Sequence, residues 1–231
     1  DDLFVELAKA YNQSFQPEKA LQLLLSHVFV ACEGGEHAIA DQYMYAWFQL
    51  GMARKAAGDY AGCYELLKKA LTLPKSLGSG IWNRCKYVPY QFHMAECLEH
   101  MGKKEDAQAI YRMILDIEVE FFSNMHLREL PYYQALCAEA LGLQQKAWNI
   151  MARAKRDWSF NLNRKDNGFF STTPFFISFA QDPAVAHRAY YQYLLGLVKL
   201  YEGDRERAKA LFRESYSGNS DSHFCHYYAH L

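Results

Sequence analysis

The sequence predicts an all-α protein in which about five helix hairpins stack in a row. Pairs of a large and a small residue recur along the chain at helical spacing, and a turn separates each pair from a second helical segment with its own small residue. Because a single hairpin buries only part of its apolar surface, neighbouring copies must stack on it. A hydrophobic fraction of 51% over 231 residues is ample material for such a core.

The clearest copy is the segment 45–74, which predicts two short antiparallel helices joined by a turn at residues 57–60. Trp47 and Leu50 supply bulk, and Gly51 leaves a gap where the second helix can approach closely. We expect Gly51 to face the small residue Cys63. The order of Trp, Leu-Gly, a small residue, Ala and Pro is the tetratricopeptide pattern, so the segment resembles a tetratricopeptide repeat.

The remaining copies are expected on both sides of this segment. The small residue of the second helix recurs at Ala20, Cys63, Ala107, Ala147 and Ala208. These spacings exceed the standard period of about 34 residues, so we expect an irregular tetratricopeptide-like superhelical array. Its repeats are predicted at about 1–31, 44–75, 88–119, 128–158 and 189–217.

An ordered aromatic insertion is predicted before the last repeat, at residues 158–187, and a C-terminal capping helix at 219–231. Turn residues and phenylalanines are concentrated in the insertion, and apolar rings require a dry surface to pack on. We expect the rings to pack along the array, and filling of its concave face is one way to do so. The phenylalanines are Phe169, Phe170, Phe175, Phe176 and Phe179.

The concave face of a tetratricopeptide array is lined by the first helix of each pair, and its residues are mostly aromatic or acidic here. Such a groove suits a hydrophobic or basic peptide, a sugar stacked on tyrosine faces, or the protein's own insertion. It does not suit an acidic C-terminal tail, which needs cations and amides. The predicted groove residues are Tyr45, Phe48, Met52, Phe92, Glu96, Glu99, Tyr132, Glu139, Tyr190 and Tyr193.

Two other clusters contain titratable side chains, but each has a simpler interpretation. Glu33, Glu36 and His37 flank paired glycines and are candidates for an acid/base or cation site, with a solvated turn as the alternative. A second set shares one helix face and is a weak metal candidate, with an exposed helix end as the alternative: His223, His226 and His230. Neither a phosphate-binding loop nor a Gly-x-Ser-x-Gly motif occurs. We therefore expect no catalytic residue, no metal and no cofactor.

Composition restricts the partners and the compartment. The formal net charge of -1 argues against a nucleic-acid partner, and no apolar run approaches the roughly 20 residues that span a bilayer. The six cysteines are scattered without a paired motif, which is typical of core residues in a reducing compartment. The sequence thus predicts a cytoplasmic protein. Because it begins at Asp1 rather than at Met, we expect an excised piece of a longer chain.

Several short motifs together resemble a larger family. A Gly-Gly-Glu turn at 33–36 precedes the clearest repeat, whose end at 73–78 is similar to a Pro-x-x-Leu-Gly connector. Gly168-Phe169-Phe170, Pro174, Phe179 and Asp182 precede the last repeat. The set resembles the C-terminal tetratricopeptide region of bacterial proteins of unknown function that begin with a β-sandwich part similar to carbohydrate-active enzymes. Cys32 departs from this pattern, because that family tends to place Trp there.

The resemblance implies that sugar chemistry would be located mainly in an N-terminal part outside this sequence. Our first functional expectation is therefore a non-catalytic scaffold for protein–protein or intramolecular domain docking. The alternative is an accessory helical domain that contributes to carbohydrate binding or turnover through the predicted groove. The expected partners are a protein, a peptide or another domain of the same chain, with carbohydrate as the further candidate.

Overall fold

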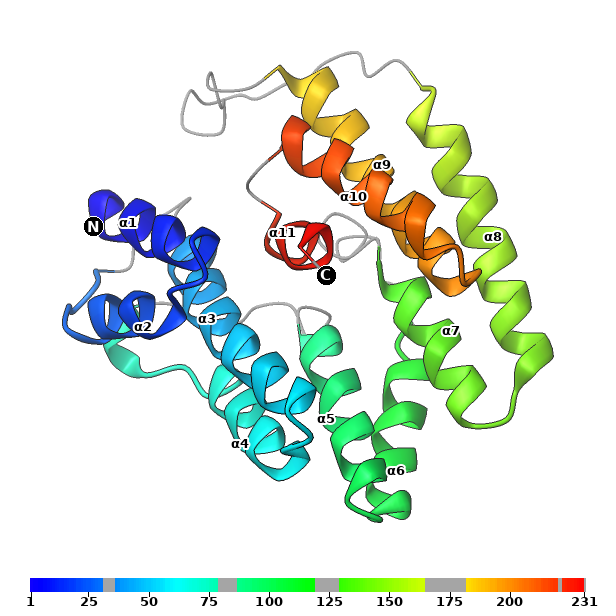
Figure 1. Ribbon diagram of the computed structural model, residues 1–231, viewed down its shortest axis with the longest axis horizontal. Coiled ribbons are helices and arrows are strands. Elements are labelled where there is room, and N and C mark those ends of the chain that lie inside the picture. Colours follow the sequence, from blue (N-terminus) through cyan, green and yellow to red (C-terminus); the bar gives the residue numbers. More distant parts are fainter. Residues whose placement is uncertain (31–35, 79–86, 119–128, 165–181, 220–221, 231) are drawn as a thin grey trace. The chain divides into compact units, whose positions relative to one another are not determined.

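The computed structural model describes residues 1–30, 36–78, 87–118, 129–164, 182–219 and 222–230 (Figure 1). These residues form eleven α-helices and one short 3-10 turn, with no strand among them, so the all-α prediction is confirmed. The chain divides into two compact units, Asp1–Leu127 and Arg128–Leu231. None of the described helices is long and apolar enough to cross a membrane.

The first unit contains three helix hairpins in chain order. Each helix packs on the next one along the chain, and α1 also contacts α3, which is the neighbour-to-neighbour packing of a repeat array. The helices are α1 (Asp2–Gln13), α2 (Pro17–Leu25), α3 (Glu36–Ala56), α4 (Tyr60–Ala70), α5 (Val88–His100) and α6 (Lys104–Leu115), with the 3-10 turn η1 (Lys75–Leu77) after α4.

The second unit contains two more hairpins and a final short helix. In Figure 1, α9 packs beside α8, α10 runs antiparallel to α9, and α11 packs on α10. The helices are α7 (Leu130–Ala140), α8 (Gln144–Leu162), α9 (Pro183–Tyr201), α10 (Arg205–Gly218) and α11 (His223–Ala229). The five hairpins and the terminal helix follow the predicted order.

Several helix boundaries differ from the expected repeat boundaries. Helix α3 begins at Glu36, eight residues before the expected repeat, and α8 and α9 extend into both ends of the predicted insertion. Proline occupies the first turn of α2 and of α7, as its missing N–H allows. Residues 165–181, which include the five phenylalanines of the insertion, lie outside the described residues.

The turns inside the hairpins share one backbone conformation. In four hairpins a glycine follows the first helix with φ between 76° and 83°, a region that L side chains rarely adopt. In the first hairpin the corresponding residue is Phe15, with φ 53°. Each hairpin therefore reverses direction through one left-handed residue. The four glycines are Gly58, Gly102, Gly142 and Gly203.

Small residues let the paired helices approach closely, as expected. A Cβ atom added at Gly51 would lie 3.2 Å from Leu67 Cδ2 and 3.7 Å from the Cys63 carbonyl oxygen. The close approach predicted for Gly51 thus occurs, although the nearest side chain is that of Leu67. In the last hairpin, a Cβ atom at Gly196 would lie only 2.5 Å from the ring of Phe212.

The described cysteines are part of the core. Four of the six lie within the described residues, and all four are free and buried: Cys63, Cys97, Cys137 and Cys225. Cys63 of α4 interacts with Cys97 of α5, and this interaction together with burial raises the pKa of the Cys63 thiol. The prediction that cysteines fill the core is confirmed for these four.

Candidate ligand-groove residues

Most of the predicted groove residues are buried in the structure. The side chains of Tyr45, Phe48, Met52, Phe92, Tyr132 and Tyr193 are at most 7% exposed. Tyr190 and Glu96 are half-buried, and Glu99 and Glu139 are exposed. The accessible members of the set are therefore mainly carboxylates.

The rings are buried because neighbouring helices pack through them. The Phe48 ring of α3 lies 5.5 Å from the Tyr90 ring and 5.6 Å from the His93 ring, both of α5. In the second unit, the Tyr193 ring lies 5.9 Å from Phe212 and 6.4 Å from Tyr228. The Phe48 contacts join two successive hairpins, and the Tyr193 contacts join α9 to α10 and to the terminal helix.

A carboxylate cluster joins α3 to α5 in the first unit. The Glu96 carboxylate accepts a hydrogen bond from Lys55 Nζ at 2.5 Å and one from His93 Nδ1 at 2.5 Å. Burial alone would raise the pKa of Glu96, but the hydrogen bonds and charges of His93 and Lys55 outweigh it and lower the pKa to about 2. Glu96 is therefore an ionised anchor between the two hairpins.

This cluster is arranged for packing rather than for acid–base chemistry. A carboxylate can only accept, so the bond to Glu96 places a hydrogen on His93 Nδ1. The other ring nitrogen, Nε2, is buried and has no hydrogen-bond partner among the described residues. A substrate would have to reach this nitrogen through the packed interior.

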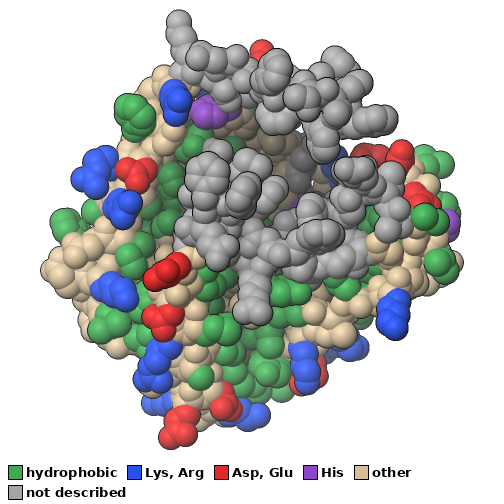
Figure 2. Space-filling view, turned by 180° about the vertical axis from the view of Figure 1, so that it is seen from behind, with side chains coloured by type: hydrophobic (Ala, Val, Ile, Leu, Met, Phe, Trp, Pro, Cys, Tyr) green, Lys and Arg blue, Asp and Glu red, His purple; other side chains and the backbone are tan. Residues whose placement is uncertain are grey.

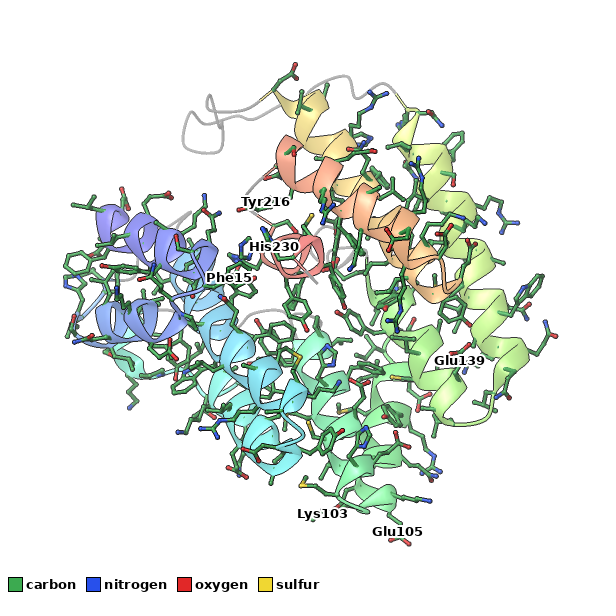
Figure 3. All side chains as sticks on the ribbon, in the orientation of Figure 1. Phe15, Lys103, Glu105, Glu139, Tyr216 and His230 are labelled. Carbon is green, nitrogen blue, oxygen red and sulfur yellow. The ribbon has the colours of Figure 1, made fainter. Side chains whose placement is uncertain are left out.

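Tyrosine hydroxyls hold the other carboxylates. Tyr111 of α6 donates to Glu99 of α5 at 2.8 Å within one hairpin. Between hairpins, Tyr201 at the end of α9 donates to Glu139 of α7 at 2.6 Å, and Tyr190 donates to Glu129 at 2.9 Å. Glu139 is labelled in Figure 3, at the end of α7. Tyrosine–carboxylate hydrogen bonds thus occur both within a hairpin and between successive hairpins.

The two weaker candidate clusters are only partly described. Glu33 lies outside the described residues, and Glu36 and His37 begin α3 without a description of their side chains. On α11, His226 is buried and His230 Nδ1 donates to the His226 carbonyl oxygen at 2.8 Å. No three His, Cys, Asp or Glu residues in the described part of the chain are placed to hold a metal ion.

Sequence reasoning missed two members of the Glu96 cluster. His93 precedes Glu96 by three residues on one helix, and this spacing alone indicates a contact. Lys55 is on another hairpin, so its distance from Glu96 depends on how α3 and α5 pack. No local pattern indicates that contact.

Comparisons with known proteins identify repeats at the centre of the first unit. Two stretches match tetratricopeptide-repeat family models, residues 45–76 and residues 90–117. They coincide with the second and third hairpins, so the chain contains tetratricopeptide repeats there.

Similar solved structures also carry such repeats. One is a candidate kinesin light chain of Podosopora anserina with nearly identical TPR-like repeats. It is 16% identical, with a TM-score of 0.37, and the match covers 95% of this chain and 94% of that chain. A single-substitution variant of the same protein matches over the same shares with a TM-score of 0.38.

Proposed function

We propose that this chain is a non-catalytic scaffold that docks a protein partner or another domain of the same protein. Tetratricopeptide repeats are arrays that present extended binding surfaces, and two hairpins match the repeat directly. The observation that carries the proposal is a set of exposed apolar side chains on the first hairpin and the segment that follows it. We call it the N-terminal apolar edge: Leu3, Leu7, Leu25, Val28 and Val30.

Three side chains of the N-terminal apolar edge are largely exposed to solvent. The exposed fractions of Leu3, Val28 and Val30 are 80%, 73% and 72%. Single exposed apolar residues are common on protein surfaces, but a set from two neighbouring elements indicates an interaction site. These side chains come from α1, from the end of α2 and from the segment after α2, so a partner or another domain of the same protein can add apolar contacts to them.

The segment that carries the two valines is held in place on α1. Asp1 accepts a hydrogen bond from His27 Nε2 at 2.8 Å and one from the Val30 N–H at 3.2 Å. The Phe4 ring stacks on the His27 ring at 4.3 Å, and Phe29 between the valines is 3% exposed. A preformed surface loses little conformational entropy on binding, which favours docking.

The ten predicted groove residues remain part of the proposal, with altered roles. Their buried rings support the helices, and Glu96 is paired with Lys55 and His93. The exposed carboxylates, Glu99 in the first unit and Glu139 in the second, favour a basic or hydrophobic peptide over an acidic one. A sugar would need accessible ring faces, and Phe48 and Tyr132 are 1% and 5% exposed. Nothing in the described side chains favours the carbohydrate alternative. The proposal that this chain is part of a larger bacterial protein with a carbohydrate-active-like part is supported by the motif resemblance alone. The cytoplasmic location remains a prediction.

Site-specific photo-crosslinking tests the docking surface. A photo-reactive phenylalanine analogue is placed at Leu3 or Val28 in the full-length protein expressed in its native host, and adducts are identified by mass spectrometry. We expect the same discrete protein, or another domain of the same chain, from both positions. The purified partner should then bind at least about tenfold more weakly to a Val28→Ser, Val30→Ser double variant, because burial of two valines is lost.

The matched control places the analogue at Phe160. This residue is 71% exposed, close to the value for Val28, but it lies on α8 of the other unit. Equal adducts from Phe160 would show general surface stickiness and contradict the proposed surface. Binding that survives the double serine variant would contradict it as well. Adducts to glycans, detected by glycan-specific staining, would favour the carbohydrate alternative.

A further inference from the structure

A cavity of about 350 Å³ lies between α10 and α11 in the second unit. Its lining combines two cationic side chains with hydroxyl and imidazole groups: Lys209, Arg213, Tyr216, Ser217, Ala229 and His230. Figure 3 labels Tyr216 and His230, which come from different helices and lie next to each other. No part of the proposed docking surface contributes to this cavity.

The cavity is lined by two cationic side chains that form no ion pair with another described residue. Lys209 and Arg213 are four residues apart on α10, so they lie on the same face of the helix and repel each other. Neither forms an ion pair in the described part of the chain. Helix α11 contains no acidic residue, and Glu214 of α10 instead accepts a hydrogen bond from Gln192. Among the described residues, neither cation is therefore paired with a carboxylate.

This positive charge is local rather than part of a large basic surface. On the face that Figure 2 shows, Lys and Arg side chains alternate with Asp and Glu side chains among the described residues. The sequence as a whole has a formal net charge of -1. A small pocket with two cations in such a protein indicates a compact anion rather than a polyanion such as nucleic acid.

The walls of the cavity are fixed by packing. The Tyr216 ring lies 5.2 Å from the His226 ring and 5.8 Å from the His230 ring. A carbonyl oxygen only accepts, so the 2.8 Å contact with the His226 oxygen fixes the His230 ring through its Nδ1 hydrogen. The Cys225 thiol donates to the Phe212 carbonyl oxygen at 3.3 Å and holds α11 on α10. The Tyr216 and His230 walls are therefore positioned before any ligand arrives.

The local helix ends oppose an anion but do not outweigh the cations. Ser217 and His230 lie at the C-terminal ends of α10 and α11. Each of these helix ends carries about half a negative charge. Two full positive charges exceed this sum. The guanidinium of Arg213 and the ammonium of Lys209 together offer more N–H donors than a two-oxygen carboxylate can use. A phosphate group presents three acceptor oxygens and therefore matches these donors better.

We propose that the cavity between α10 and α11 binds a phosphate group, with Lys209 and Arg213 as its cationic ligands and His230 and Tyr216 as its walls. The shared chemistry is a phosphate monoester, carried either by a small molecule or by a phosphorylated side chain of a protein. The volume of about 350 Å³ exceeds that of a phosphate ion and leaves room for the group that carries it.

Calorimetric titration of the intact protein tests the site with inorganic phosphate, with a phosphoserine peptide and with the unphosphorylated peptide. We expect saturable binding of inorganic phosphate, and binding at least about tenfold weaker in Lys209→Gln and in Arg213→Gln, because each removes a charge-assisted hydrogen bond. A phosphopeptide that binds more tightly than inorganic phosphate assigns the site to a phosphorylated protein. Equal affinities assign it to a small phosphate compound.

The matched control is Arg207→Gln, which removes one exposed cation of the same helix outside the cavity. This variant should bind phosphate like the unmodified protein, and Lys209→Arg should retain binding because it keeps the charge. All variants are compared by far-ultraviolet circular dichroism. The proposal is overturned if phosphate shows no saturable binding, if Arg207→Gln weakens it as much as Arg213→Gln, or if the unphosphorylated peptide binds as tightly as the phosphopeptide.

Discussion

Phe15 occupies a backbone position that favours glycine. Four hairpins place glycine at the left-handed turn position, with open space where a Cβ atom would lie, whereas the first hairpin places Phe15 there at φ 53°. A residue with a side chain costs roughly 1–2 kcal/mol in this conformation. The Phe15 side chain is 50% exposed, so its packing offsets only part of that cost.

We expect Phe15→Gly to stabilise the protein by about 1 kcal/mol, because relief of the strained backbone exceeds the greater flexibility of glycine in the unfolded chain. Urea denaturation followed by circular dichroism measures the change. The converse control is Gly102→Ala, which should destabilise by a similar amount through its positive φ alone. A destabilised Phe15→Gly variant would show that the ring contributes more by packing than the backbone conformation costs.

At the scale of helices, Glu96 connects two hairpins that the sequence pattern treats as independent. Its carboxylate accepts hydrogen bonds from Lys55 on α3 and from His93 on α5. The pKa of Glu96 is lowered to about 2 in the folded state, against an ordinary glutamate value of about 4.3. Its charge therefore stabilises the fold above the unfolded-state pKa, and this contribution is lost as the pH falls from about 4.5 toward 2.

We expect Glu96→Gln to cost about 2 kcal/mol at pH 7, a value reduced for solvent screening because the side chain is 30% exposed. The difference in unfolding free energy between the two proteins should shrink as the pH falls from 4.5 toward 2. Urea denaturation at a series of pH values measures it. Glu105→Gln on α6, at an exposed residue, is the matched control and should show little difference at any pH. A constant difference between Glu96→Gln and the unmodified protein would show that charge is not the cause.

At the scale of the whole molecule, the sequence predicts the repeat but not how the repeats join. Helical periodicity, the turn at each hairpin and the small residue at Gly51 are local patterns, so the five hairpins and the close helix approach follow from them. The roles of Phe48 and Tyr132 do not. An aromatic residue on a first helix has the same spacing whether it lines an open face or packs on the next hairpin, and the packing of neighbours decides which.

The cavity between α10 and α11 was not predicted for the same reason. The spacing of Lys209 and Arg213 places two cations on one helix face, a pattern that also occurs on solvated surfaces. The position of His230 beside Tyr216 depends on how α11 packs on α10, and only the structure provides this packing.

Neighbour-to-neighbour packing also predicts how far a local perturbation spreads. A Cβ atom at Gly196 would lie 2.5 Å from the ring of Phe212, which is 2% exposed and stacks on Tyr228 of α11. We expect Gly196→Ala to destabilise by about 1–3 kcal/mol, because overpacking a buried ring outweighs the better helix propensity of alanine. Gly51→Ala, whose nearest contact is 3.2 Å from the Leu67 side chain, should cost less.

Hydrogen exchange followed by mass spectrometry locates the effect. In Gly196→Ala, amide exchange should increase most in α9 and α10, then in the adjoining α8 and α11, and least in α1 and α2, because each helix contacts mainly its neighbours in the chain. Gly51→Ala should instead affect α3 and α4 most. If Gly196→Ala raised exchange uniformly across all helices, the chain would unfold as one cooperative block and the description as an array of neighbouring hairpins would fail.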